Sequence, residues 1–256
     1  MKELRSRRAW WRSVTGCIAG SRLALGQRRS PAGAISVSGS AAIFSVEYGR
    51  PMESVAYTFI QAYGWRITFD EAPIVHAEDM VEVTRDLRAG IRVFDPRGGH
   101  LEFTYELQPG TEAPGDPERV LRTAMETYNR SGFPGRYDLV AVDGYFHIVP
   151  IFYTDASGAG RAGGSPLDSI VTVIGGGRGP QLVLRDLVQE VESVSGFRIL
   201  VGRTPFLDGV QPVIDHRFEN MQARSLLKAL IDATGKRRIW YLMCDPGKRR
   251  YGLSIL

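Results

Sequence analysis

The segment Pro51–Phe69 (PMESVAYTFIQAYGWRITF) joins an amphipathic helix to a strand, and this unit decides the fold. Counted from Met52, its apolar residues recur at positions i, i+3, i+4, i+7, i+8 and i+11, which predicts one buried helix face. Pro51 suits the first turn of that helix, and Gly64 suits a left-handed cap at its end. The alternating residues after Gly64 predict a strand.

The same unit recurs 132 residues later. Gly196 takes the place of Gly64, and Phe197–Val201 (FRILV) takes the place of the strand. The apolar helix positions of this second unit are Leu184, Leu187, Val188 and Val191. Four consecutive positions match: a glycine, an aromatic residue, an arginine and an isoleucine. This match predicts an internal duplication.

A second helix and a hairpin follow each unit. Asp116 predicts the N-cap of this helix in the first half, and Asn220 predicts it in the second. Asp143–Gly144 and Asp245–Gly247 predict the two hairpin turns. With strands expected over 42–46, 100–107, 170–174 and 212–218, the order becomes β-α-β-β-α-β-β, twice. The sequence therefore predicts an α+β fold of two tandem small domains, each with two helices packed on small mixed sheets.

Composition divides the chain into four parts. Residues 1–40 are expected to form a basic leader or disordered tail. Residues 41–153 are expected to form the first domain, with an insert near 72–98, and residues 168–256 the second. Between them, residues 154–167 are rich in glycine and serine, which predicts a flexible linker.

The leader holds most of the positive charge. Its first 30 residues carry eight Lys or Arg against Glu3 alone, so the other 226 residues carry a net charge of −3 although the chain carries +4. Ser6–Trp10 resembles a twin-arginine export motif, Ala32–Ala34 fits a cleavage site, and Val14–Cys17 resembles a lipoprotein box. Against these, Arg12 and Arg22 interrupt the apolar segment that an export signal needs. A signal peptide and a disordered basic tail are both open. Because no run of 18 apolar residues exists, no integral membrane span is expected.

The second half carries a family resemblance. Phe218–Leu230 (FENMQARSLLKAL), followed by Thr234–Gly235, resembles the short N-terminal (STN) domain of outer-membrane secretins and TonB-dependent receptors, and the first half resembles it more loosely. The resemblance implies two tandem STN-like copies that act in the periplasm, bind protein partners of the cell envelope and catalyse no reaction. A cytoplasmic location is the alternative. The family's signature residues are core and cap positions, so it implies no binding residues.

One candidate surface for a partner or an anionic ligand lies around the last hairpin. Its residues are Arg237, Arg238, Trp240, Lys248, Arg249 and Arg250. Basic residues with interleaved aromatic rings are typical of surfaces that bind single-stranded nucleic acid or another anionic polymer, which is the alternative function. A charged sheet edge that discourages aggregation explains the same residues, and a nucleic-acid partner is not favoured.

The sequence predicts no catalytic, cofactor or metal site. Glu71, Glu78, Asp79 and His76 are the acid–base candidates, but a solvated acidic loop is the favoured interpretation. Gly175–Gly179 lacks the P-loop and dinucleotide patterns and is expected to be a strand-to-helix turn. The histidines are scattered, and Cys244 is expected to be a buried apolar side chain rather than a redox group.

Overall fold

The computed structural model describes residues 32–84, 92–202, 204, 213–215, 217–235 and 238–256. These residues have the predicted α+β fold, with four α-helices and strands arranged in several small sheets. The helices are α1 (Pro51–Tyr63), α2 (Pro117–Arg130), α3 (Pro180–Ser195) and α4 (Ala223–Ala233). None of the helices in this part of the chain has the length and hydropathy needed to cross a membrane.

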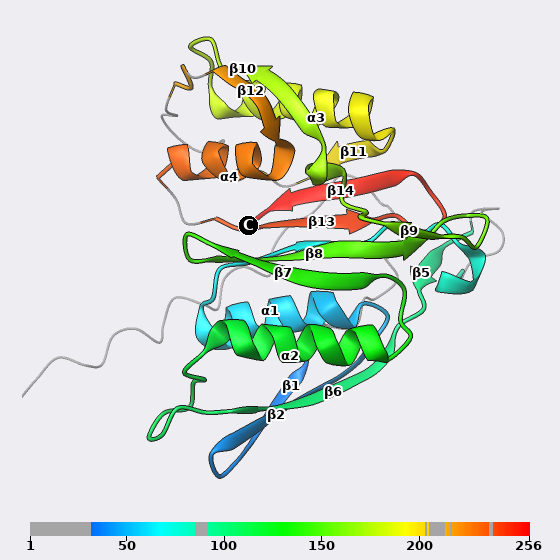
Figure 1. Cartoon of the computed structure of the whole chain (residues 1–256), viewed down its shortest axis with the longest axis vertical. Helices are drawn as coiled ribbons and strands as arrows, with labels where there is room; N and C mark the ends of the chain where they lie inside the picture. Colours follow the sequence, from blue (N-terminus) through cyan, green and yellow to red (C-terminus); the bar gives the residue numbers. More distant parts are fainter. Residues whose placement is uncertain (1–31, 85–91, 203, 205–212, 216, 236–237) are drawn as a thin grey trace, which may run out of the picture. The chain divides into compact units, whose positions relative to one another are not determined.

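The first repeat contains two groups of paired strands. β2 (Ala41–Tyr48) pairs with β6 (Gly99–Glu106) antiparallel. β3 (Ile67–Asp70) pairs with β8 (Tyr145–Thr154) parallel, and β7 (Arg136–Val142) pairs with β8 antiparallel. Helices α1 and α2 lie between the sheet that contains β2 and β6 and the sheet that contains β7 and β8 (Figure 1).

The second repeat has the same pairings. β10 (Ile170–Ile174) pairs with β12 (Arg217–Gln222) antiparallel, as β2 does with β6. β11 (Arg198–Val201) is parallel to β14 (Arg250–Ile255), and β13 (Trp240–Cys244) is antiparallel to it. The two repeats therefore share both element order and strand topology. The glycine caps also match, with φ values of 68° at Gly64 and 69° at Gly196.

One sheet joins the two repeats. β13 pairs parallel with β3, which gives the strand order β11-β14-β13-β3-β8-β7, and β9 (Gly160–Ala162) pairs with β8. β7, the counterpart of β13, runs antiparallel to β3, so the second repeat is turned over relative to the first. As a result, α3 and α4 cover the opposite face of this sheet from α1 and α2 (Figure 1). Residues 31–256 accordingly form one compact unit rather than two domains on a tether.

Each repeat has its own apolar core, and the two cores exchange residues. The first contains Phe44, Phe59 and Phe103 and also takes in Tyr241 from β13 of the second repeat. The second is built from the apolar faces of α3 and α4 and takes in Ile74 of the first repeat. Neighbouring side chains in a strand point to opposite faces, so Trp240 enters one core and Tyr241 the other.

Several predicted boundaries were wrong. The leader was predicted to reach residue 40, but β1 (Ala34–Ser38) pairs with β2; residues 1–31 lie outside the described chain. The predicted linker is part of the fold, since it forms β9 and the 3-10 turn Pro166–Asp168, in which Leu167 is buried. The insert contains the 3-10 turn Ala77–Asp79 and the paired strands β4 (Met80–Glu82) and β5 (Phe94–Pro96).

The two predicted N-caps had different outcomes. Asp116 accepts a hydrogen bond from the backbone N–H of Arg119 at 3.0 Å, as expected of an N-cap. Asn220 was wrongly predicted as the cap of the other helix. It lies in β12 with φ 50°, and α4 begins after Gln222. The strand continues past Asn220, because Met221 and Gln222 pair with Val171 and Ile170 of β10, so the helix begins later than the local pattern indicated.

Replacing Gly64 with alanine should lower the free energy of unfolding by about 1 kcal/mol, because an L side chain is strained in the left-handed region. A Cβ at Gly64 meets no atom within 4 Å, so the cost comes from the backbone alone. Urea denaturation measures it. Gly252→Ala is the matched control, since Gly252 has equal space and no positive φ; an equal loss in both variants would contradict the assignment.

Candidate functional site

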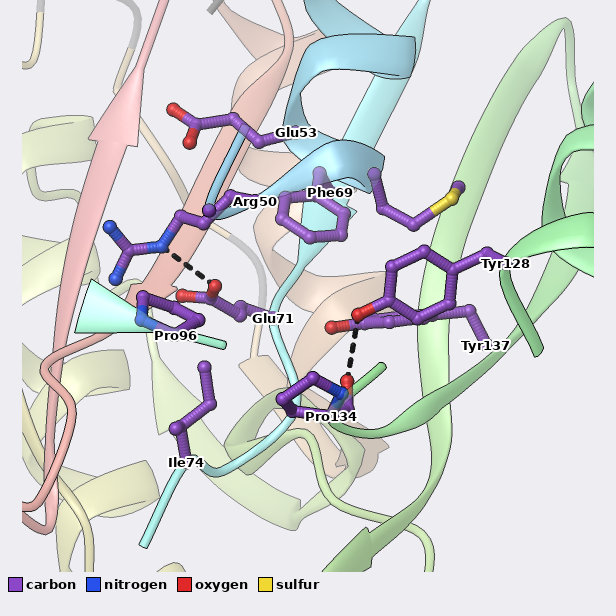
Figure 2. Close-up of a pocket in the computed structure, with 11 residues that line it drawn as sticks. Arg50, Glu53, Phe69, Glu71, Ile74, Pro96, Tyr128, Pro134 and Tyr137 are labelled. Carbon is purple, nitrogen blue, oxygen red and sulfur yellow. Dashed lines mark hydrogen bonds and ion pairs between the residues drawn. The ribbon is translucent and has the colours of Figure 1, made fainter. Parts of the chain in front are cut away.

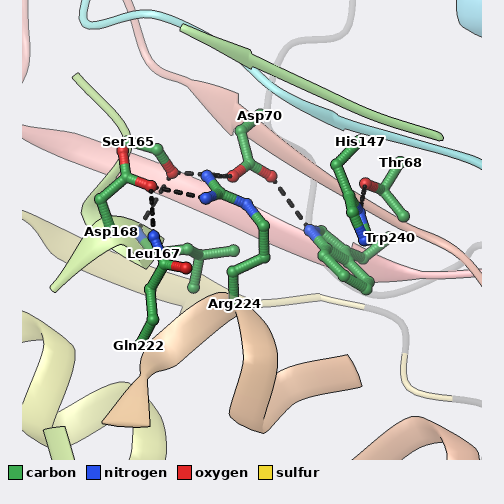
Figure 3. Close-up of polar contacts among 9 residues, drawn as sticks. All are labelled: Thr68, Asp70, His147, Ser165, Leu167, Asp168, Gln222, Arg224 and Trp240. Carbon is green, nitrogen blue, oxygen red and sulfur yellow. Dashed lines mark hydrogen bonds and ion pairs between the residues drawn. The ribbon is translucent and has the colours of Figure 1, made fainter. Parts of the chain in front are cut away.

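Asp70 ends β3 and is buried where the two repeats meet. Its carboxylate accepts hydrogen bonds from Nη2 of Arg224 at 2.6 Å, Oγ of Ser165 at 2.8 Å and Nε1 of Trp240 at 3.0 Å (Figure 3). Arg224 also donates to Asp168 at 2.5 Å. Burial alone would lower the pKa of Arg224, but the two carboxylates outweigh it and raise that pKa. The cluster ties α4 to β3 by a buried ion pair.

Glu71 follows directly and forms a second buried ion pair. Its Oε1 lies 2.8 Å from Nε of Arg50 (Figure 2). The pair also binds the backbone of Cys244, since Glu71 accepts from its N–H at 2.8 Å and Arg50 donates to its C=O at 2.9 Å. The two side chains thus give Cys244 the donor and acceptor that a neighbouring strand would supply. A small cavity of about 10 Å³ beside them, bounded also by Tyr128 and Tyr137, is about the size of one water molecule (Figure 2).

His147 lies in the same junction and is only 2% exposed. Its Nδ1 is 2.6 Å from Oγ1 of Thr68 (Figure 3), and its ring stacks on those of Tyr145 and Trp240. Burial lowers the pKa of His147 to about 4, although the Asp70 carboxylate opposes this. At neutral pH the imidazole is therefore uncharged.

A groove of about 350 Å³ opens beside this junction. Its floor is the face of β7 and β8 that points away from α1 and α2. Val140, Val142 and Ile151 form the exposed part of the floor, with 45%, 41% and 46% exposure. The other lining residues are His147, Val149, Pro150, Gly163, Asp168, Gln222, Arg224 and Ser225. A concave site with an apolar floor and a few polar groups at its wall is typical of a binding site.

The predicted surface around the last hairpin is not assembled as expected. Trp240 is fully buried, so its prediction as a surface residue is wrong; β13 is an inner strand of the seven-stranded sheet and both of its faces are covered. Trp240 pairs with Ile255 and Cys244 with Tyr251, which places Arg238, before β13, and the residues 248–250, after the turn, at opposite ends of the hairpin.

The basic residues of that surface have separate surroundings. The guanidinium of Arg249 lies 5.0 Å from the ring centre of Phe197. Lys248 and Arg250 both pair with Asp245. Arg238 is half-buried, and Arg237 lies outside the described residues.

Neither of the two cavities described above brings two of the acid–base candidates together. Glu71 is held by Arg50, whereas the side chain of Glu78 is 84% exposed, with its carboxylate 3.8 Å from His76. Partial burial raises the pKa of Asp79. Neither cavity described above is lined by His76, Glu78 or Asp79.

The glycine-rich turn and the cysteine have structural surroundings. In the turn Gly175–Gly179, Arg178 donates to the carbonyl of Gly175 and pairs with Asp186 on α3. Its guanidinium therefore closes the turn on itself. Burial raises the pKa of the Cys244 thiol to about 12, which keeps it protonated.

The most connected residues of the junction, Asp70, Arg224 and His147, were not predicted as site residues. One local signal existed, since two consecutive acidic residues, Asp70 and Glu71, at the end of a short strand are unusual at a buried position. The groove had a weaker signal, the alternation of Val140 and Val142 in a strand next to an Asp-Gly turn. Neither pattern indicates which partner lies opposite.

Comparison of the chain with protein-family models, with curated proteins and with solved structures found no match. The function proposed below therefore rests on the geometry of the described residues and on the sequence pattern.

Replacing Arg224 with methionine should lower the free energy of unfolding by roughly 3–5 kcal/mol, because it leaves the Asp70 carboxylate buried and without its cation. Chemical denaturation measures the loss. Adding Asp70→Asn should recover part of it. Arg122→Met, which removes an exposed pair with Glu118, is the control and should cost less than about 1 kcal/mol. Similar losses in both single variants would contradict the central role of the cluster.

His147 should make stability depend on pH. Its pKa is about 4 when folded and 6.5 when unfolded, so between these values only the unfolded chain takes up the proton. The free energy of unfolding should therefore fall by roughly 3 kcal/mol as pH drops from 6.5 to 4. His147→Gln should lose this component, and His100→Gln, at an exposed histidine, should keep it. Identical pH profiles for wild type and His147→Gln would refute the assignment.

Proposed function

We propose that the chain is a non-catalytic interaction module of the cell envelope that binds a protein partner in the periplasm. The observation that carries this proposal is the groove over β7 and β8, whose apolar floor is exposed in three places. Exposed apolar clusters in a concave surface are typical of sites that bind another molecule. The inner strands β3 and β13 of the same sheet are buried along almost their whole length, so the groove stands out as uncovered sheet.

The repeated topology supports the same proposal. The sequence predicted the order β-α-β-β-α-β-β twice, and each repeat has that order with equivalent strand pairing, as two tandem STN-like copies would. Proteins of that resemblance act by contact with partners in the envelope. The basic leader, with its twin-arginine-like motif, agrees with export.

The geometry favours binding over the two alternatives. For catalysis, the strongest acid–base candidate, Glu71, is occupied by Arg50 and the backbone of Cys244. For an anionic polymer, the rings of Trp240 and Tyr251 would have to be exposed for stacking, and both are buried.

Export can be measured by fusing a phosphatase that is active only outside the cytoplasm to the C-terminus of the full chain. The proposal predicts phosphatase activity in a Gram-negative host and its loss when residues 2–31 are deleted. An inactive fusion, with the intact leader still attached in the cytoplasm, would count against the envelope role.

Partner binding through the groove can be measured with a photo-crosslinking residue in exported protein. At Val142 it should give a discrete adduct with another protein. At Glu126, on the exposed side of α2, it should give none, because that position lies away from the groove. No adduct at Val142, or the same adduct at both positions, would contradict the proposal.

A further inference from the structure

β7 is one of the two outer strands of the seven-stranded sheet. Its closing pair with β8 is Val142 with Tyr145 across a two-residue turn, so the backbones of residues 138, 140 and 142 bond to β8. The backbones of Tyr137, Leu139 and Ala141 therefore point away from the sheet. An outer strand of this kind can accept a further strand unless its polar groups are occupied.

One end of this outer edge is occupied by a side chain. Asn129, near the end of α2, accepts from the N–H of Tyr137 at 2.9 Å and donates to its C=O at 2.9 Å. The Leu139 N–H donates to the adjacent Asp138 carboxylate. Among the described residues, no side chain bonds the outward backbone of Ala141. Within Leu139–Val142, the outward groups that remain open are therefore the C=O of Leu139 and the N–H and C=O of Ala141.

The other outer strand, β11, is a poorer acceptor. Arg198 and Gly202 donate to β14, so the backbones of Ile199 and Val201 point outward. Glu192 accepts from the Ile199 N–H at 2.6 Å. The residue equivalent to Glu192 in the first repeat is Ile60, because the backbone carbonyl of each accepts the N–H of the glycine cap. In the first repeat the equivalent strand, β3, pairs with β13. The repeat with the outer strand β11 therefore has a carboxylate, Glu192, that occupies the strand edge, and the repeat with the inner strand β3 has the apolar residue Ile60 at that position.

The stretch Leu139–Val142 of β7 borders the groove. Val140 and Val142 alternate with Ala141 and form part of the groove floor. In a strand added beside β7, alternate side chains would lie next to these two valines. Main-chain hydrogen bonds would supply affinity, and the apolar floor would select apolar side chains.

The charge of the groove wall favours a basic partner. Asp168 lines the groove with a side chain that is 39% exposed, and it shares the single cation of Arg224 with the buried carboxylate of Asp70. Two carboxylates to one guanidinium leave a net charge of −1 at this wall. His147, the other titratable group in the lining, is uncharged at neutral pH. A lysine or arginine of the partner would neutralise the wall.

We infer that the groove accepts an extended segment of the partner protein, which adds as a strand to β7 at Leu139–Val142. Its apolar side chains lie on Val140 and Val142, and a lysine or arginine lies beside Asp168. This inference rests on the proposed function and specifies how the partner is recognised.

The test uses blocked hexapeptides of alternating valine and threonine that carry one lysine or, in the control peptide, one glutamate. Binding to the full chain is measured by NMR titration at low salt. The lysine peptide should bind several-fold more tightly, with shifts centred on residues 139–142. Asp168→Asn should remove this preference, because it removes the negative charge of the wall.

Ala141→Pro tests the strand pairing. Proline at an outward position of an outer strand keeps the bonds to β8 but removes one donor from the edge. Binding of the lysine peptide should weaken about fivefold, the effect of one hydrogen bond. Ala141→Ser keeps the donor and should bind as wild type does. If Ala141→Pro fails to fold, Val142→Asn, at an exposed position, should weaken binding by placing an uncharged polar group on the apolar floor.

Equal binding of both peptides to the wild-type chain, or binding that survives both Ala141→Pro and Val142→Asn, would overturn the inference. These outcomes are separate from those of the proposed function. A chain that is exported and crosslinks at Val142, yet binds neither peptide, would keep the envelope role and lose strand addition. A chain that binds the lysine peptide but stays in the cytoplasm would keep strand addition and lose the envelope role.

Discussion

The parallel pairing of β13 with β3 is the contact on which the rest of the structure depends. It spans only two residue pairs, Tyr241 with Phe69 and Leu242 with Asp70. Two buried carboxylates lie at the end of this pairing: Asp70 binds Arg224, and Glu71 binds Arg50. A buried ion pair contributes little net stability, but breaking it is costly, so it can fix one register against others. We infer that these two ion pairs select the register in which β13 pairs with β3.

The junction also explains why equivalent strands have different surroundings. All four residues of β3 are buried because β13 and β8 flank it. In β11, its counterpart, Leu200 and Val201 remain about two-fifths exposed. Duplicated sequence thus gives one inner and one outer strand. The second repeat is turned over, so α4 faces β8 without covering β7, and the groove lies along that uncovered part.

The same physical device recurs at three places where strand pairing stops. A side chain supplies the hydrogen bonds that a further strand would have made: Arg50 and Glu71 at Cys244, Asn129 at Tyr137, and Glu192 at Ile199. Occupied edges resist unwanted pairing with other chains. The stretch of β7 beside the groove differs from these ends, which is why a partner strand is placed there.

The sequence by itself determined the parts that depend on near neighbours. Helix periodicity, the glycine caps at Gly64 and Gly196, the Asp116 cap and the Asp143–Gly144 turn are local, so the duplicated order followed from them. The tertiary structure decided the burial of Trp240, the ordered course of residues 154–167 and the position of the groove. Each of these depends on which strand lies beside β13, and that choice is made by side chains more than 150 residues apart, such as Asp70 and Arg224. No local pattern carries that information, because the sequence of a strand and of the glycine cap before it can be the same for an inner strand and for an outer strand.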